Sequence, residues 1–220
     1  IGMVFGFVSS LRPDNTWADA GETPFNSLQP GLRAFANRLK AAYPESEVYG
    51  WIEVQANAGT DGYRLGEEGV HTIVADLSRS AVNDLGFDGV FLDVKPLWTG
   101  DADYLTLLRT VRRRIGLDTP IAVSVPPDLT PSNVDFDLPA VIAPGTEWDE
   151  EYKQRVALQS DHLIVTAYHS YHDDPVNYIE WVAYQVEAFS EALDAIDSGI
   201  TILISLPNYP ADLPAHDPTI

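Results

Sequence analysis

Hydrophobic and polar residues alternate along segment 87–97 with the two-residue period of a β-strand. The two alternating sets are Val90, Leu92 and Val94 on one face, and Phe91, Asp93 and Lys95 on the other. Pro96 cannot continue a central strand, so the strand ends there. If helices cover the aliphatic face, Asp93 and Lys95 point to the opposite side. We expect the chemistry of the protein on that side.

A second segment, 48–55, divides in the same way. Its aliphatic and small residues alternate with a polar and aromatic set made of Tyr49, Trp51, Glu53 and Gln55. Apolar runs predict four further buried strands, at 3–9, 121–125, 162–168 and 200–206.

Apolar residues at helical spacing predict five helices between these strands. The first begins at an N-cap, Ser27, with Pro30 in its first turn. Three more cover about 70–81, 101–115 and 148–158. The last begins at Pro175, and its predicted inward face consists of Ile179, Val182, Val186, Phe189, Leu193 and Ile196. Segment 126–145 has five prolines and no clear period, so it is either an elaborated loop or holds an edge strand at 140–143.

The alternation of six strands with five helices predicts parallel strands joined by helical crossovers. An open doubly wound sheet and a closed barrel both satisfy this order. No glycine-rich phosphate loop follows a strand, and polar side chains gather at the carboxyl ends of the strands. We therefore expect an α/β fold, a (β/α)8 TIM-type barrel in one domain over 1–220. A barrel has eight strands, so the first and last are expected to be lacking and the chain trimmed at both ends.

The composition narrows the range of partners. The formal charge is -20, from 33 acidic and 13 basic residues, which disfavours nucleic acid and anionic membranes as partners. The acidic residues are dispersed, as in halophilic proteins or in acidic secreted ones. No apolar run has the roughly 20 residues of a membrane span, so no membrane insertion is expected. The absence of cysteine excludes disulfides and thiolate sites.

Residues 88–95, Asp-Gly-Val-Phe-Leu-Asp-Val-Lys, resemble the fourth-strand motif Asp-Gly-x-Asp-x-Asp-x-Glu of the chitinase-like glycoside hydrolases of family 18. Thr-Ala-Tyr-His at 166–169 lies where that family has Met-x-Tyr-Asp, and Leu-Pro-Asn-Tyr at 206–209 resembles its seventh-strand Pro-x-Tyr. Trp-Ile-Glu at 51–53 falls on its third strand. The resemblance implies a barrel that acts on or binds a β-linked, N-acetylated or plain polysaccharide, and an extracellular or cell-surface location.

The chain departs from this motif at two of its three inward acids. Phe91 and Lys95 replace acids, and only Asp93 is kept. In the family the glutamate protonates the leaving oxygen, and a lysine, which ordinarily stays protonated, does not fill that role easily. Hydrolysis is therefore expected to be impaired, or relocated to Glu53, and the chain to be an enzyme or a pseudoenzyme. The alternative for Glu53 is a structural ion pair with Lys95.

The candidate site gathers groups from several strand ends. The catalytic candidates are Asp93, Lys95, Glu53 and Tyr168. The candidates for substrate binding are Trp51, Gln55, Trp98, His169, Tyr171 and Tyr209, because aromatic rings at a barrel mouth suit a glycan. No cofactor is expected. A metal site at His169, His172 and the two aspartates that follow lacks a known ligand spacing, and no metal is expected.

Three other hypotheses stay open. A desolvated Lys95 could form a Schiff base with a carbonyl substrate, as in class I aldolases. The chain could instead be a structural or adhesive glycan-binding surface protein without an active site. The arginines 109 and 112–114 near one helix end could bind phosphate or simply complement the helix dipole. The sequence leaves the oligomeric state and the identity of the glycan undetermined.

Overall fold

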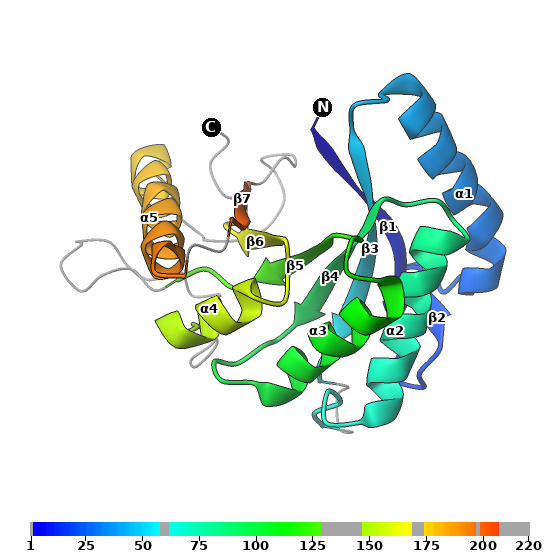
Figure 1. The fold of residues 1–220 in the computed structure, drawn as a ribbon, viewed down its shortest axis with the longest axis horizontal. Coiled ribbons are helices and arrows are strands. Elements are labelled where there is room, and N and C mark those ends of the chain that lie inside the picture. The colour runs from blue at the N-terminus through cyan, green and yellow to red at the C-terminus, as the bar shows by residue number, and fades with distance from the viewer. Residues whose placement is uncertain (1, 58–61, 129–146, 169–173, 197–198, 207–220) are drawn as a thin grey trace. The chain divides into compact units, whose positions relative to one another are not determined.

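Strands and helices alternate along the chain as the sequence pattern predicted (Figure 1). The computed structural model describes residues 2–57, 62–128, 147–168, 174–196 and 199–206. Within these residues the main strands are β1 Met3–Leu11, β3 Glu47–Gln55, β4 Gly89–Lys95, β5 Ile121–Val125, β6 His162–Thr166 and β7 Thr201–Ser205. The helices are α1 Phe25–Ala42, α2 Glu68–Asn83, α3 Ala102–Ile115, α4 Glu150–Ala157 and α5 Pro175–Asp194.

The residues form two compact units, which we describe separately. The first contains Ile1–Leu97, Asp101–Val123 and Gln159–Asp161. Its strand order is β2-β1-β3-β4-β5, in which the two-residue strand β2 (Trp17–Ala18) is antiparallel and the other pairs are parallel. The expectation of one domain over 1–220 stays a prediction.

The second unit contains Trp98–Gly100, Ser124–Leu158 and His162–Ile220. Strands β6 and β7 pair in parallel from His162 and Thr201 onward. Helix α5 packs on their end, where Ala167, Tyr178 and Trp181 form a buried cluster and the Tyr178 hydroxyl donates to the Ala167 carbonyl at 2.5 Å.

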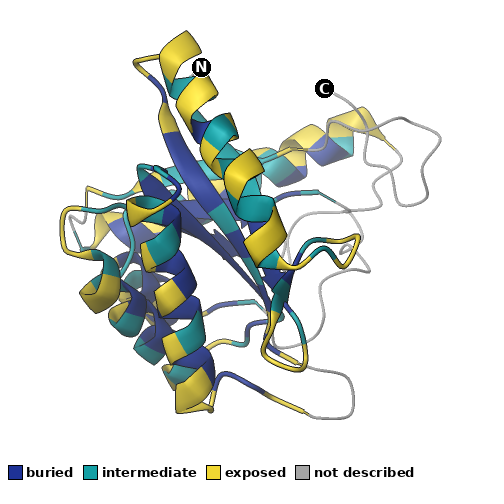
Figure 2. Ribbon diagram, turned by 90° about the vertical axis from the view of Figure 1, so that its right-hand side faces the viewer, coloured by how far each residue is buried: buried dark blue, intermediate teal, exposed yellow. Residues whose placement is uncertain are grey.

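Strand β4 has the two faces that its sequence predicted. Val90, Leu92 and Val94 are buried, and α2 contacts this strand. Figure 2 shows the strands of the sheet largely in the dark blue of buried residues. Phe91 and Asp93 lie on the other face. Packing of the aliphatic residues therefore fixes the backbone of β4, and this backbone positions the side chains of the candidate site on the other face.

The first two residues of the motif have structural functions. The Asp88 carboxylate accepts a hydrogen bond from the Val48 amide at 2.9 Å and pairs with Lys40 at 2.5 Å, which fixes the start of β4 beside β3. A Cβ on Gly89 would lie 2.6 Å from the Pro120 carbonyl oxygen. Glycine is therefore required here by the close approach of the chain before β5.

Two helix predictions were wrong in detail. Helix α1 begins at Phe25 after Pro24, so Ser27 is not its N-cap and Pro30 lies inside the helix. Its first turn has no side-chain cap, because the side chain of Pro24 at the N-cap position has no acceptor, and the Ser27 amide donates to the Pro24 carbonyl.

The inward face of α5 agrees with the predicted one only in part. Phe189 and Leu193 are buried as predicted. Ile179 and Val186 are 46% and 44% exposed, whereas Tyr178, Trp181 and Gln185 are buried. Aromatic packing buries the two rings, and hydrogen bonds between Gln185 and the backbone of Asp128 satisfy the buried amide. The specific partners of these polar and aromatic side chains outweigh the aliphatic pattern.

Candidate functional site

The polar face of β3 and β4 forms the candidate site in the first unit. The parallel register pairs Trp51 with Phe91, Glu53 with Asp93, and Gln55 with Lys95. Neighbouring strands lie about 4.8 Å apart, so the side chains of each pair stand side by side on the same face. The site therefore has three levels along the strands. The aromatic pair lies toward the amino ends, the two acids lie in the middle, and Gln55 and Lys95 lie at the carboxyl ends.

Asp93 and Lys95 form an ion pair within one strand. The Lys95 ammonium lies 2.9 Å from Asp93 Oδ1 and donates a hydrogen bond to Oδ2 at 3.2 Å. The Asp93 side chain is 5% exposed and that of Lys95 is 49% exposed. Oδ1 is buried and lies within ion-pair distance of the ammonium, although the geometry of this contact is not that of a hydrogen bond. The pair compensates the buried charge and leaves the ammonium at the rim of the site.

Glu53 does not form the ion pair with Lys95 that was one of the two hypotheses for it. Among the described residues it has no hydrogen bond and no ion pair, and its side chain is half-buried. The register places it at the level of Asp93, two residues or about 7 Å before the level of Lys95. Glu53 is therefore an uncompensated carboxylate beside a compensated one.

An aromatic layer lies beneath these charges. The Trp51 ring meets Phe7 edge-on and is tilted against Phe91, each at 5.7 Å between ring centres, and Phe5 contacts Phe91 at 5.1 Å. Trp51 lies in the middle of β3, so its expected place at a strand end was wrong. Its indole Nε1 is buried and has no hydrogen-bond partner among the described residues. The Trp51 ring thus packs against neighbouring aromatic rings, and its indole N–H has no acceptor among the described residues.

Tyr49 lies at the amino-terminal side of this layer. It is buried, and burial raises the pKa of its hydroxyl far above the ordinary value, with further contributions from its hydrogen bond to Glu47 and from the charge of that carboxylate. Tyr49 is therefore a neutral core residue that supports the layer.

Sequence reasoning missed a buried arginine beside the site. The Arg64 guanidinium is buried and donates to the backbone oxygens of Arg12 at 2.9 Å and Gln55 at 3.4 Å, and to the Asn15 side chain at 2.7 Å. It ties the segments that follow β1 and β3 together. No sequence signal could have found it, because two of its acceptors are backbone oxygens, which every residue has.

The remaining predicted site residues belong to the second unit or lie outside the described residues. Trp98, in the segment after β4, and Tyr168, directly after β6, are half-buried and belong to the second unit. His169, Tyr171 and Tyr209 lie outside the described residues. The structure therefore brings together five of the predicted residues, namely Trp51, Glu53, Gln55, Asp93 and Lys95.

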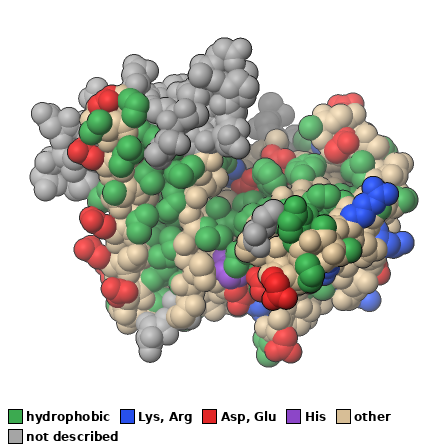
Figure 3. Space-filling model, turned by 90° about the horizontal axis from the view of Figure 1, so that it is seen from above, with side chains coloured by type: hydrophobic (Ala, Val, Ile, Leu, Met, Phe, Trp, Pro, Cys, Tyr) green, Lys and Arg blue, Asp and Glu red, His purple; other side chains and the backbone are tan. Residues whose placement is uncertain are grey.

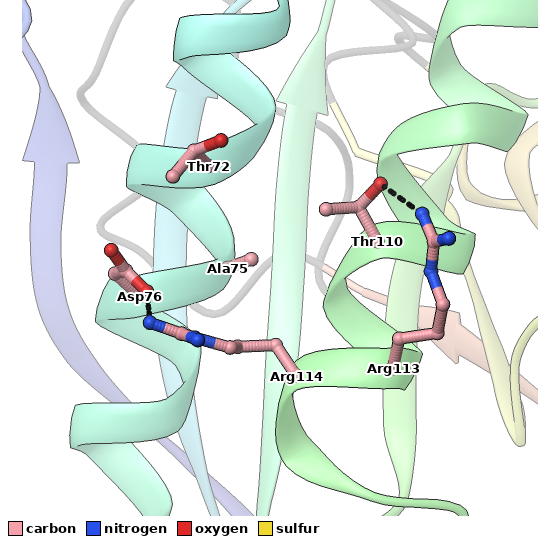
Figure 4. A pocket seen from close by; sticks show the side chains of 6 residues that line it. All are labelled: Thr72, Ala75, Asp76, Thr110, Arg113 and Arg114. Atoms are coloured by element: carbon pink, nitrogen blue, oxygen red, sulfur yellow. Dashed lines mark hydrogen bonds and ion pairs between the residues drawn. The ribbon is translucent and has the colours of Figure 1, made fainter.

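The arginines at the end of α3 are held by neighbouring groups. Figure 4 shows the groove between α2 and α3, about 320 Å³, where Arg114 pairs with Asp76 and Arg113 donates to the Thr110 hydroxyl at 3.3 Å. Arg112 pairs with Asp161 at 2.6 Å and donates to the Thr119 carbonyl at 2.7 Å. These contacts favour the structural hypothesis over the phosphate site.

The acidic side chains are spread over the surface and do not form a recognisable metal site among the described residues. Acidic side chains are seen at several separate places on the face in Figure 3, as the dispersed sequence pattern predicted. In the part of the chain that the structure describes, no three His, Asp or Glu side chains are grouped to hold a metal ion. Asp174 caps α5 by accepting from the Val176 amide, while His169, His172 and Asp173 lie outside the described residues.

Solved structures show which fold this arrangement of strands belongs to. A chitinase from Chromobacterium violaceum matches 94% of this chain with 61% of its own length, at a TM-score of 0.62 and 14% identity. The Group IV chitinase of Ostrinia furnacalis in complex with allosamidin matches 93% of this chain with 57% of its own length, at a TM-score of 0.62 and 15% identity. The chitinase domain of a spore coat protein from Clostridium difficile matches 94% of this chain with 65% of its own length, at a TM-score of 0.59 and 13% identity.

The chain thus has a chitinase-like α/β barrel fold and spans less than two thirds of the length of these structures. The prediction of the fold class is confirmed, with six of the eight parallel barrel strands present among the described residues. No protein-family model matches the sequence, and no curated protein sequence matches it. Within the described residues, no helix combines the length and the apolar character that a membrane crossing requires.

Proposed function

We propose that the polar face of β3 and β4 binds a β-linked glycan without cleaving it by the family mechanism. The observation that carries the proposal is the ion pair between the Lys95 ammonium and Asp93 Oδ1, 2.9 Å apart, on the strand where the resemblance places the catalytic acids. The chitinase-like fold supports a carbohydrate ligand at this end of the strands.

The chemistry of the pair supports the proposed loss of hydrolysis. The family acid must release a proton to the leaving oxygen, and its neighbouring aspartate must orient the acetamido group that attacks the anomeric carbon. An ammonium bonded to a carboxylate is stabilised in its charged form and keeps its proton. Asp93 in turn is buried and directed to Lys95, so neither group is arranged for its part of the reaction.

Relocation of the acid to Glu53 is the second candidate function. Glu53 is the uncompensated acid of the site, which favours it. The position of Glu53 argues against this function, because Glu53 lies about 7 Å before Lys95 along the strand direction. A Schiff base at Lys95 needs a neutral amine, and the ion pair with Asp93 opposes that form.

Calorimetric titration of the chain with chito-oligosaccharides and with cello-oligosaccharides tests binding, while release of reducing ends tests cleavage. We expect saturable binding, no reducing ends, and weaker binding for Gln55→Ala than for the matched control Gln29→Ala on α1. Absence of binding to every β-linked oligosaccharide refutes the proposal. Reducing ends that disappear in Glu53→Gln but persist in Lys95→Gln establish the relocated hydrolase instead.

A further inference from the structure

Resting on the proposed function, we propose that the site recognises a glycan with free amino groups, a β-linked glucosamine oligomer, through an ion pair with Glu53. The three charged side chains of the site carry a net charge of one negative, because Lys95 compensates Asp93 and no cation among the described residues pairs with Glu53. The chemical class that completes the site is therefore a sugar that bears an ammonium group.

The surroundings of Glu53 leave its charge unmatched. On one side its register partner is Asp93, whose ion pair is with Lys95. On the other side its register partner is Ser10 of β1, a neutral side chain. The guanidinium of Arg64 bonds to backbone oxygens and to Asn15, so it does not pair with Glu53 either.

Burial makes a cationic ligand more favourable than a neutral one at this position. A half-buried carboxylate has lost part of its hydration, and a neutral hydroxyl or acetamide restores only a hydrogen bond. An ammonium restores both the hydrogen bond and the charge balance, and such charge-assisted bonds are about twice as strong as neutral ones. The same ammonium lies within the negative field of a chain with net charge -20, which speeds the encounter with a polycation.

Aromatic and donor groups beside Glu53 suit the rest of such a sugar. The Trp51 ring lies on the same strand face two residues before Glu53, and its Nε1 has no partner among the described residues. The Trp51 ring thus provides an apolar face and one donor beside Glu53.

Calorimetric titration in mildly acidic, low-salt buffer compares tetrasaccharides of glucosamine, N-acetylglucosamine and glucose. We expect the glucosamine tetramer to bind about tenfold more tightly than the other two, the value of one hydrogen bond to a charged group. Glu53→Gln should remove that preference. Glu45→Gln, which removes the same charge at an exposed position, should keep the preference.

The outcomes separate this inference from the proposed function. If no tetrasaccharide binds, the proposed function fails and this inference with it. If the acetylated tetramer binds as tightly as the glucosamine tetramer, only the inference is overturned. Equal losses in Glu53→Gln and Glu45→Gln also overturn it, because they assign the preference to the overall charge instead of the site.

Discussion

Replacing Lys95 by glutamate reverses the charge next to a buried carboxylate. At 2.9 Å and an effective dielectric constant of about 20, two unit charges interact by about 6 kcal/mol. The Lys95 side chain is 49% exposed, so solvent reduces this value, and we expect about 2 kcal/mol from the loss of the attraction alone. Lys95→Glu adds a repulsion of similar size, which gives a loss of about 4 kcal/mol in the free energy of unfolding.

Urea denaturation at neutral pH measures both values, with Lys95→Met as the matched variant that removes the charge without reversing it. The expected order of stability is wild type, then Lys95→Met, then Lys95→Glu. In about 1 M salt the gap between the two variants should narrow, because the Debye length falls to about 3 Å. Equal stabilities of Lys95→Met and Lys95→Glu at low salt would refute the reasoning, since Asp93 would then not respond to the charge at position 95.

Three further predictions concern the support of the fold. Gly89→Ala should lower the free energy of unfolding by about 2 kcal/mol or more, because its Cβ meets the Pro120 carbonyl at 2.6 Å, and the exposed Gly69→Ala serves as control in urea denaturation. Lys153→Met should lower the free energy of unfolding by about 3–5 kcal/mol, because it leaves the Asp128 carboxylate, which is only 17% exposed, without the ammonium that lies 2.6 Å away. Arg114→Met, at an exposed pair, should cost about 1 kcal/mol or less. If Lys153→Met and Arg114→Met lowered the free energy of unfolding equally, the expected effect of burial would be contradicted. Because burial raises the pKa of Tyr49, stability should fall as the pH rises above about 10, where the unfolded tyrosine ionises, and Tyr49→Phe should show a smaller fall between about pH 9 and pH 11.

The sequence by itself determined the alternation of strands and helices and the two faces of β3 and β4. The aliphatic residues of β4 are buried as their period predicted, and Asp93 and Lys95 share the opposite face. These features are local, because a two-residue or 3.6-residue period is set by the geometry of one strand or one helix. The fold class followed from the order of these elements, and the solved chitinases share it.

Only the tertiary structure decided which charge meets which. The sequence left Lys95 with two acids to choose from, and the register of β3 against β4 placed Glu53 beside Asp93 and opposed Lys95 to Gln55. Register depends on how two distant segments pack, so no local period contains it. The same is true of Gly89. Glycine is required there because the Pro120 carbonyl, 31 positions further along the chain, leaves no room for a Cβ.

The buried polar residues show this division most clearly. Gln185 and Arg64 are charged or polar side chains that a hydrophobic pattern assigns to the surface, yet both are buried. Their acceptors and donors are mostly backbone atoms of distant segments. A buried polar group is stable only where such partners exist, and the partners are created by the fold itself. The sequence therefore specified the strands of the candidate site, and the packing of those strands made Glu53 its one uncompensated charge among the charged residues described there.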